Sequence, residues 1–252
     1  MNIETQLKAI EADVNEIKEN VTKVYDAGKS YRNNEFWKAI TNGGKRSNYD
    51  GVFCGTRFNK NNFFPTYNIT PGSADKMFMS IVITSVDEQV DMEELENKMG
   101  IIFDFSKCNK IGQCFAGALF KTLNVIDITN AASAGYAFYG GYTTLKLKRI
   151  NRLIISENTR LDDSMFGYAS ELNYIGFEGV IAKTITLSSS PLIAESAKKL
   201  IMCLKNHAGT DYQLKYKLTL KNTVWEALNS AETPPSGNTW QDYVQSLGWL
   251  YA

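Results

Sequence analysis

The chain has 252 residues, and its 27 basic and 27 acidic side chains give a formal net charge of zero. This balance argues against a general attraction to nucleic acid or to an anionic membrane. A hydrophobic content of 44% is typical of a globular protein and argues against disorder.

The N-terminal residues give no targeting signal. Met1 to Lys8 lack the apolar core and cleavage site of a signal peptide. No run elsewhere approaches the roughly 18 apolar residues of a membrane-spanning helix. We therefore expect synthesis in a cytoplasm, with no membrane insertion.

The first 24 residues contain an unbroken heptad pattern. Its apolar positions alternate in spacing between four and three: Ile3, Leu7, Ile10, Val14, Ile17, Val21 and Val24. So narrow a stripe is buried only against copies of itself, and Ile at the d positions favours three or four strands. We expect residues 1–27 to form a coiled-coil stalk that holds a homotrimer, with a tetramer left open. The alternative is an amphipathic helix that folds back on its own domain.

Residues 28–75 form a second predicted region, an aromatic connector. Its rings are expected to pack on the first layer of the following domain: Tyr49, Phe53, Phe58, Phe63, Phe64 and Tyr67. Met77 to Thr84 follow as a predicted buried strand.

Residues 76–186 contain short apolar runs that recur irregularly, about every 20 to 27 residues. The runs are Ile101–Phe105, Leu123–Ile128, Ile150–Ile155 and Leu172–Phe177. An aromatic residue beside small residues precedes the last three. Because one such unit cannot bury its own apolar side, we expect the units to stack into a solenoid. An ordinary α+β domain with coincidental spacing is the alternative.

Residues 187–252 are predicted to form a C-terminal α/β cap over the last unit. The pattern predicts a helix over Glu195–Asn206 and a half-exposed strand over Gln213–Lys221. Two further helices are expected, at Thr223–Leu228 and from Trp240 to a stop at Gly248.

Four short motifs recur in the repeat region: Cys114–Gly117, Met165–Tyr168, Leu172–Ile175 and Phe177–Ile181. They are flanked by Glu35–Trp37, Gly43–Tyr49, Ser190–Lys205, Tyr212–Leu220, Thr239–Tyr243 and Leu247–Trp249. The ordered combination of these motifs and segments resembles proteins with BspA-type leucine-rich repeats, in particular phage and prophage structural proteins of gut anaerobes. Ile193 departs from the pattern, because similar sequences tend to carry a Thr there that caps the helix.

The resemblance implies an α+β fold: an N-terminal coiled-coil helix, a short, irregular leucine-rich-repeat solenoid and a C-terminal α/β cap. It also implies a non-enzymatic virion component, such as a tail fibre, spike or baseplate fibre that contacts the host surface. Partners would be further copies of the chain, other virion proteins and a host glycan or protein. A BspA-like bacterial adhesin is one alternative, and a polysaccharide depolymerase is another.

We find no sequence motif for catalysis or for a cofactor. Nucleotide-binding, metalloprotease and nucleophile-elbow patterns are missing. The four cysteines are not spaced as zinc ligands, and His207, the only histidine, is expected to cap a helix end. A depolymerase would draw its carboxylates from Asp162, Asp163, Glu171 and Glu178. Lys146, Lys148, Arg149 and Arg152 form a basic patch without the aromatic ladder of a nucleic-acid site.

The repeat region is rich in tyrosine. If these rings are exposed, each offers a large contact area with a polar tip, which suits recognition of a glycan or protein. The predicted receptor-contact residues are Tyr136, Tyr139, Tyr142, Tyr168 and Tyr174. The competing interpretation is that the rings fill the core between repeats.

Overall fold

A computed structural model describes residues 14–15, 17–18, 46–55, 57–58, 69–80, 82–83, 90–93, 96, 103–118, 120–140, 147–161 and 164–252. Every strand pairing in it is parallel. The first sheet pairs β1 (Arg57–Phe58) with β2 (Val82–Ile83). The second orders β3 (Val90–Asp91), β4 (Phe120–Asp127), β5 (Arg149–Ile155) and β6 (Tyr174–Gly179). The third orders β7 (Ile185–Leu187), β8 (Lys217–Leu220) and β9 (Leu250–Tyr251).

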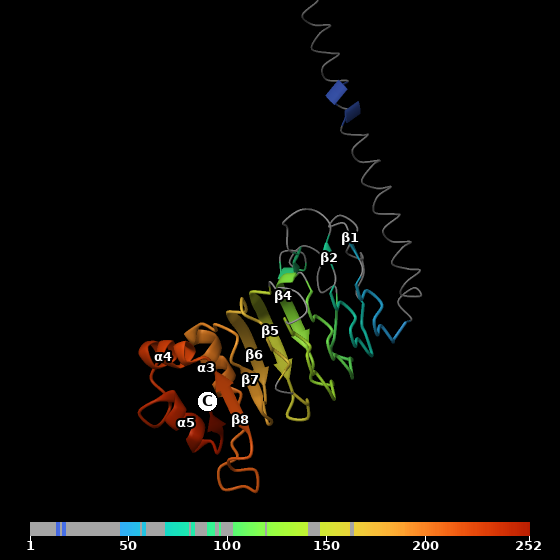
Figure 1. Cartoon of the computed structure of the whole chain (residues 1–252). Coiled ribbons are helices and arrows are strands. Elements are labelled where there is room, and N and C mark those ends of the chain that lie inside the picture. The colour runs from blue at the N-terminus through green and yellow to red at the C-terminus, as the bar shows by residue number, and fades with distance from the viewer. Residues whose placement is uncertain are drawn as a thin grey trace, which may run out of the picture.

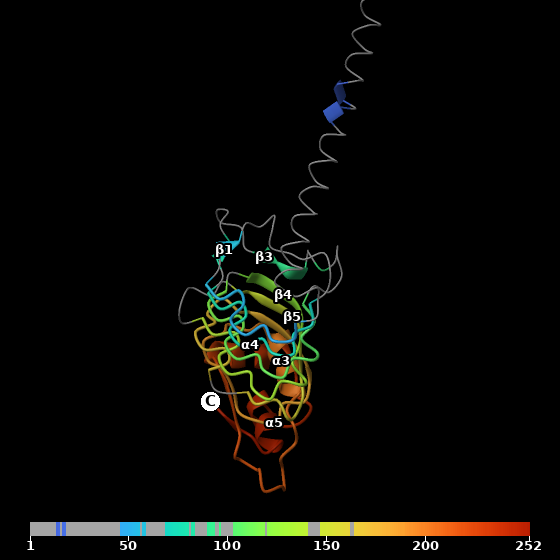
Figure 2. The same ribbon diagram turned by 90° about the vertical axis from the view of Figure 1, so that its right-hand side faces the viewer.

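Besides the helical residues at 14–15, 17–18, 92–93 and 96, three helices lie at the C-terminal end of the described structure. They are α3 (Ala194–Met202), α4 (Asn222–Ala231) and α5 (Trp240–Ser246). Figure 1 shows β4, β5 and β6 side by side, followed by β7, β8 and these helices. Figure 2 views the same sheet nearly along the direction in which its strands follow one another, with β4 in front of β5.

Alternation of apolar and polar residues explains the central sheet. Leu123 in β4, Ile150 in β5 and Ile175 in β6 occupy one cross-strand row and are all buried in the core. Their neighbours Thr122, Arg149 and Tyr174 form the adjacent row, on the opposite face. The predicted runs at Leu123–Ile128, Ile150–Ile155 and Leu172–Phe177 are therefore confirmed as strands, within three residues of the expected bounds, and these strands pair in parallel.

Stacked turns form a second column along the chain. Each turn donates backbone N–H groups to the carbonyls of the next, as from Phe53 to Met77, Phe78 to Cys114 and Phe115 to Ala137. One phenylalanine per turn faces the core, and these rings stack: Phe53, Phe78, Phe115, Phe138 and Phe166. Successive ring centroids are 5.6, 5.6, 5.5 and 5.3 Å apart, with interplanar angles of 3–22°. We call this row the phenylalanine ladder.

The expected fold class is wrong. The described residues form three short helices and small parallel sheets in an α/β-like arrangement, with no long N-terminal coiled-coil helix or regular solenoid evident. Pairing register shifts between Val90 and Asp91, and again between Ile150 and Leu153, so the strands do not repeat one fixed unit. Helix α3 then packs on β6 and ends the sheet. The boundaries predicted after residues 27, 75 and 186 stay predictions.

Two strand predictions are also wrong in extent. Met77 and Phe78 lie in a stacked turn, and among the described residues of the expected Met77–Thr84 strand only Val82–Ile83 forms a strand. In the expected Gln213–Lys221 strand, Leu214 adopts a left-handed backbone and donates its N–H to the Gly248 carbonyl. This turn shortens β8 to Lys217–Leu220. The alternation of apolar and polar residues over Gln213–Lys221 does not predict this turn.

Two glycines allow the last strand of the central sheet to approach its neighbour. A Cβ at position 176 would collide with the carbonyl oxygen of Asn151, and one at position 179 with that of Ile155. Gly179 also has a φ of +93°, which L side chains rarely adopt. Glycine is therefore required at both positions for β6 to pair with β5 here.

Phe115 is the central ring of the ladder, and it also meets Phe105 and Phe120 edge to face. We predict that Phe115→Ala lowers the free energy of unfolding by about 3–5 kcal/mol, because it leaves a cavity among the four rings that Phe115 contacts. Phe115→Leu should cost roughly 1–2 kcal/mol. Urea denaturation measures both. Tyr251→Ala, at an exposed ring, is the control, and a Phe115→Ala cost no larger than the control's would contradict a structural role for the ladder.

The N-terminus of α3 lacks a side-chain cap. Its N-cap residue, Ile193, is exposed and has an extended backbone, whereas Thr239 of α5 accepts a hydrogen bond from the Asp242 N–H at 3.1 Å. We predict that Ile193→Thr raises the free energy of unfolding by about 0.5–2 kcal/mol, because the hydroxyl accepts from the first turn. Ile193→Val has the same branched shape without the hydroxyl. Equal stability of the two variants in urea denaturation would contradict the prediction.

Candidate functional site

Three of the five predicted receptor-contact tyrosines form one cluster. The Tyr139 ring meets the Tyr136 ring at 5.2 Å and the Tyr168 ring at 5.5 Å between centroids, edge to face in both cases. Tyr136 is 39% exposed and Tyr168 is 66% exposed, with Tyr139 half-buried between them. The competing interpretation, that the rings fill the core, does not hold for this tyrosine cluster.

The phenylalanine ladder positions the cluster. Phe138 and Phe166 stack at 5.3 Å, and the Gly140 N–H donates to the Gly167 carbonyl at 2.8 Å. Tyr136 precedes its ladder residue by two positions, and Tyr168 follows its own by two. A Cβ at Gly167 would lie 2.9 Å from two carbons of the Tyr139 ring. Glycine at position 167 therefore leaves the space that the Tyr139 ring occupies.

Both exposed tyrosines have a left-handed backbone. The φ angles are +57° for Tyr136 and +59° for Tyr168. At the corresponding positions of other turns the same conformation is adopted by glycine, as at Gly51 and Gly117, and by the non-glycine residues Lys76, Ser80 and Gln113. The left-handed region costs an L residue about 1–2 kcal/mol. Large rings are thus held at positions where the backbone favours glycine.

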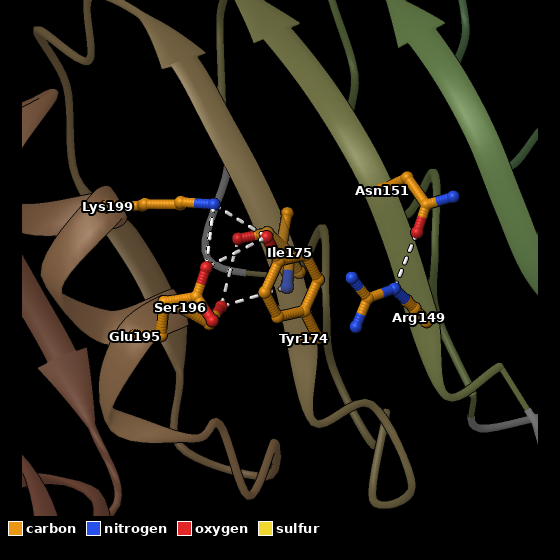
Figure 3. A network of polar contacts seen from close by, with 7 residues as sticks. All are labelled: Arg149, Asn151, Tyr174, Ile175, Glu195, Ser196 and Lys199. Atoms are coloured by element: carbon orange, nitrogen blue, oxygen red, sulfur yellow. Dashed lines mark hydrogen bonds and ion pairs between the residues drawn. The ribbon is translucent and has the colours of Figure 1, made fainter.

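Of the other two predicted tyrosines, the structure describes only Tyr174. Tyr142 lies outside the described residues. Tyr174, in β6, is only 6% exposed and belongs to a polar network on the outer face of the central sheet. Figure 3 shows its ring between the guanidinium of Arg149 and helix α3. Its hydroxyl accepts a hydrogen bond from Lys199 at 2.7 Å. The prediction that Tyr174 belongs with Tyr136 in one contact surface is not supported by this placement.

The predicted oligomerisation residues lie mostly outside the described residues. Val14 and Ile17 are the exceptions; both are helical, and they are 42% and 61% exposed. Ile3, Leu7, Ile10, Val21 and Val24 are not described. Among the residues that the structure describes, nothing covers the side chains of Val14 and Ile17, and a partner could contact both.

Of the four carboxylates considered for sugar cleavage, the structure describes Glu171 and Glu178, and each lies beside a cation. Asp162 and Asp163 lie outside the described residues. Glu178 accepts two hydrogen bonds from Arg152, at 2.7 and 2.8 Å, and this contact lowers the pKa of the carboxyl. A general acid needs a raised pKa instead. Glu171 lies 4.0 Å from the Lys148 ammonium, a surface ion pair.

The cysteines and the histidine have packing roles. All four thiols are free, and burial raises the pKa of Cys108 and of Cys203 to about 11. Such thiols are weak nucleophiles at neutral pH. His207 does not cap a helix with its side chain as expected: its buried ring packs against Tyr216 and Trp249, with Nε2 3.3 Å from the Ala182 carbonyl.

Sequence reasoning found the tyrosines but missed the Arg149 network. Thr122, Arg149 and Tyr174 are cross-strand neighbours in three successive strands. Their spacings of 27 and 25 residues follow the repeat, so an alignment of the units would have brought them together. The local sequence around Arg149 indicates only a basic patch and does not predict its cross-strand contact with Tyr174.

Within the described ranges, no group of three or more His, Cys, Asp or Glu side chains is placed to hold a metal ion. Among the same residues, no helix has both the length and the apolar character needed to cross a bilayer. Comparison of the chain with protein families, with curated proteins and with solved structures found no match.

Proposed function

We propose that this chain is a non-enzymatic, receptor-binding subunit of a bacteriophage or phage-tail-like particle. It would be part of a tail fibre, spike or baseplate fibre in the virion and contact a glycan or protein on the host surface. Other virion proteins would hold its N-terminal region. The single observation that carries the proposal is the exposed tyrosine cluster of Tyr136, Tyr139 and Tyr168 on left-handed turns.

Backbone strain at these positions supports a recognition role. Non-glycine residues in sparsely populated backbone regions cluster at functional sites, where the surrounding structure holds them in place. Here the backbone hydrogen bonds of the stacked turns and the stacked Phe138 and Phe166 rings hold Tyr136 and Tyr168. Neither exposed ring is needed to fill the core. The conformational cost is explained if the rings contact another molecule.

The geometry of the cluster suits an extended surface ligand. Edge-to-face packing leaves the rings at steep angles to one another, 71° and 86°, so that faces, edges and hydroxyl groups are all presented. Tyrosine combines apolar area with a polar tip and loses little side-chain entropy on binding. Sugar rings and polypeptide surfaces both offer the mixture of apolar and polar groups that such a cluster contacts.

The double change Tyr136→Gly and Tyr168→Gly tests the proposal. We predict that binding of the fluorescently labelled full chain to host cells falls at least about tenfold, as expected for loss of central aromatic contacts. The free energy of unfolding should stay within about 1 kcal/mol of the parent, because glycine relieves the left-handed backbone. Flow cytometry and urea denaturation measure the two quantities.

Lys76→Gly is the matched control for that experiment. Lys76 has a φ of +58° and precedes the ladder residue Phe78 by two positions, as Tyr136 precedes Phe138. It is an exposed residue without a ring. Cell binding should be unaffected by Lys76→Gly. Undiminished binding by the double glycine variant, with the fold intact, would contradict the proposed contact surface.

Self-association through residues 1–27 is part of the same proposal, as a homotrimer that multiplies weak contacts. The exposed apolar side chains of Val14 and Ile17 support it. We predict that Ile10→Asp with Ile17→Asp converts the full chain from a trimer to a monomer in light scattering, because carboxylates desolvate poorly in an apolar contact. Asn15→Asp, at an exposed position between them, is the control. A monomeric parent chain at micromolar concentration would contradict the prediction.

A further inference from the structure

Arg149 is fixed in one orientation on the outer face of the central sheet. Its guanidinium carbon lies 3.7 Å from the centroid of the Tyr174 ring, close enough for a cation–π contact. Its Nε donates to the Asn151 side chain at 2.5 Å, and Asn151 in turn donates to Asn124 at 3.2 Å. Figure 3 shows the guanidinium beside the ring, with Asn151 above it. These contacts occupy one face of the guanidinium and its Nε. Among the described residues, no hydrogen bond is formed by its two terminal amino groups, which can therefore donate to a ligand.

The platform under Arg149 is itself held firmly. The Tyr174 ring is buried, and its hydroxyl accepts from Lys199, whose ammonium also lies 2.9 Å from a Glu195 oxygen. The Ser196 hydroxyl bonds both to the N–H and to the carbonyl of Ile175, at 2.8 and 2.9 Å. Helix α3 is thereby tied to β6 directly behind the ring (Figure 3).

Arg149 differs from three nearby cations in the partners that the described residues offer it. Arg152 binds both oxygens of Glu178, Lys199 pairs with Glu195, and Lys148 lies 4.0 Å from Glu171. In the part of the chain that the structure describes, no carboxylate pairs with Arg149. Arg149 contributes to the lowered pKa of Glu195, but the hydrogen bond from Lys199 is the largest cause.

We infer that Arg149 is an oxyanion-binding subsite, which takes a carboxylate or phosphate group of an acidic host-surface polymer. This inference rests on the proposed function, since it names the chemistry of the surface ligand. A guanidinium presents a planar fork of N–H donors that matches either oxyanion in a bidentate manner. Because stacking and the Asn151 contact already fix the fork, little further side-chain entropy is lost on binding.

A groove lies on the α3 side of Tyr174, where Lys199 and Glu195 contact the Tyr174 hydroxyl. Its volume is about 350 Å³, and its lining includes Lys199, Glu195, Lys198 and the exposed side chain of Met202. Charged groups of both signs with an apolar side chain suit the hydroxyls and carbon faces of neighbouring sugar or polyol units. We place the neighbouring units of the polymer in this groove, because two of its lining side chains, Lys199 and Glu195, also contact the Tyr174 hydroxyl.

Purified polymers test the inference without cells. The full chain is titrated with polygalacturonate, poly(glycerol phosphate) and neutral dextran, and binding is followed by biolayer interferometry. We expect at least one anionic polymer to bind at least about tenfold more tightly than dextran, and Arg149→Gln to weaken that binding at least about tenfold. The anionic polymer that is preferred identifies the oxyanion as a carboxylate or a phosphate.

Arg152→Gln is the matched control, since it removes the same charge from the same strand at a residue that already has a carboxylate partner. It should change binding less than about twofold, as for an exposed charge outside the contact. Arg149→Lys keeps the charge without the planar fork and should bind with intermediate strength. Thermal unfolding of each variant, with binding measured well below the midpoints, separates a loss of binding from a loss of fold.

Three results would overturn the inference: no preference of the parent chain for either anionic polymer, full binding by Arg149→Gln, or an equal loss in Arg152→Gln. Each is separate from the proposed function. Cell binding that depends on Tyr136 and Tyr168 but not on Arg149 would leave the receptor-binding proposal in place and remove only the oxyanion subsite.

Discussion

The phenylalanine ladder is the constraint on which the described structure depends. Parallel segments are separated by about 4.8 Å in the hydrogen-bonding direction, and the ladder rings follow one another at 5.3–5.6 Å with nearly parallel planes. Rings can stack at this interval only in an offset arrangement, which requires each turn to lie in register with the next. The backbone hydrogen bonds between turns, such as Phe115 to Ala137, impose the same register. Two independent interactions thus fix the height of each turn.

This register determines where side chains can be displayed. Left-handed residues lie two positions before or after the ladder phenylalanine in turn after turn, as at Gly51, Lys76, Gln113 and Tyr136. Such a residue reverses the chain next to a core ring, so its own side chain has no place in the core and is directed to the surface. Glycine meets the conformational requirement at the lowest cost. A tyrosine at the same position keeps the turn and adds a surface contact, and this is why strain and exposure coincide at Tyr136 and Tyr168.

The sequence predicted the features that depend on local pattern and missed those that depend on register. Alternating apolar residues located β4, β5 and β6, and small residues beside aromatics located the turns at Phe115, Phe138 and Phe166. The sequence predicts a connector at Phe53 and a strand at Phe78, where the structure has turns, because no long alternating run follows either residue. The fold class failed for a related reason: similar spacing does not show that pairing register is constant, and it shifts in β3 and β5. The contact between Arg149 and Tyr174 could not be predicted from local pattern, because it depends on the pairing of two residues that are 25 positions apart in the sequence.

The two surfaces use rigidity in different ways. At the tyrosine cluster, rigidity comes from backbone turns that hold bulky rings outward in spite of their conformational cost. At Arg149, it comes from side chains, because a buried ring, an amide and helix α3 fix a cation that would otherwise sample many rotamers. In both cases the ordering cost is met when the chain folds and not when it binds, so a small contact can be strong for its area. A single small contact remains weak in absolute terms. Several copies held together would combine such contacts, provided that the linkage lets them engage one surface at once.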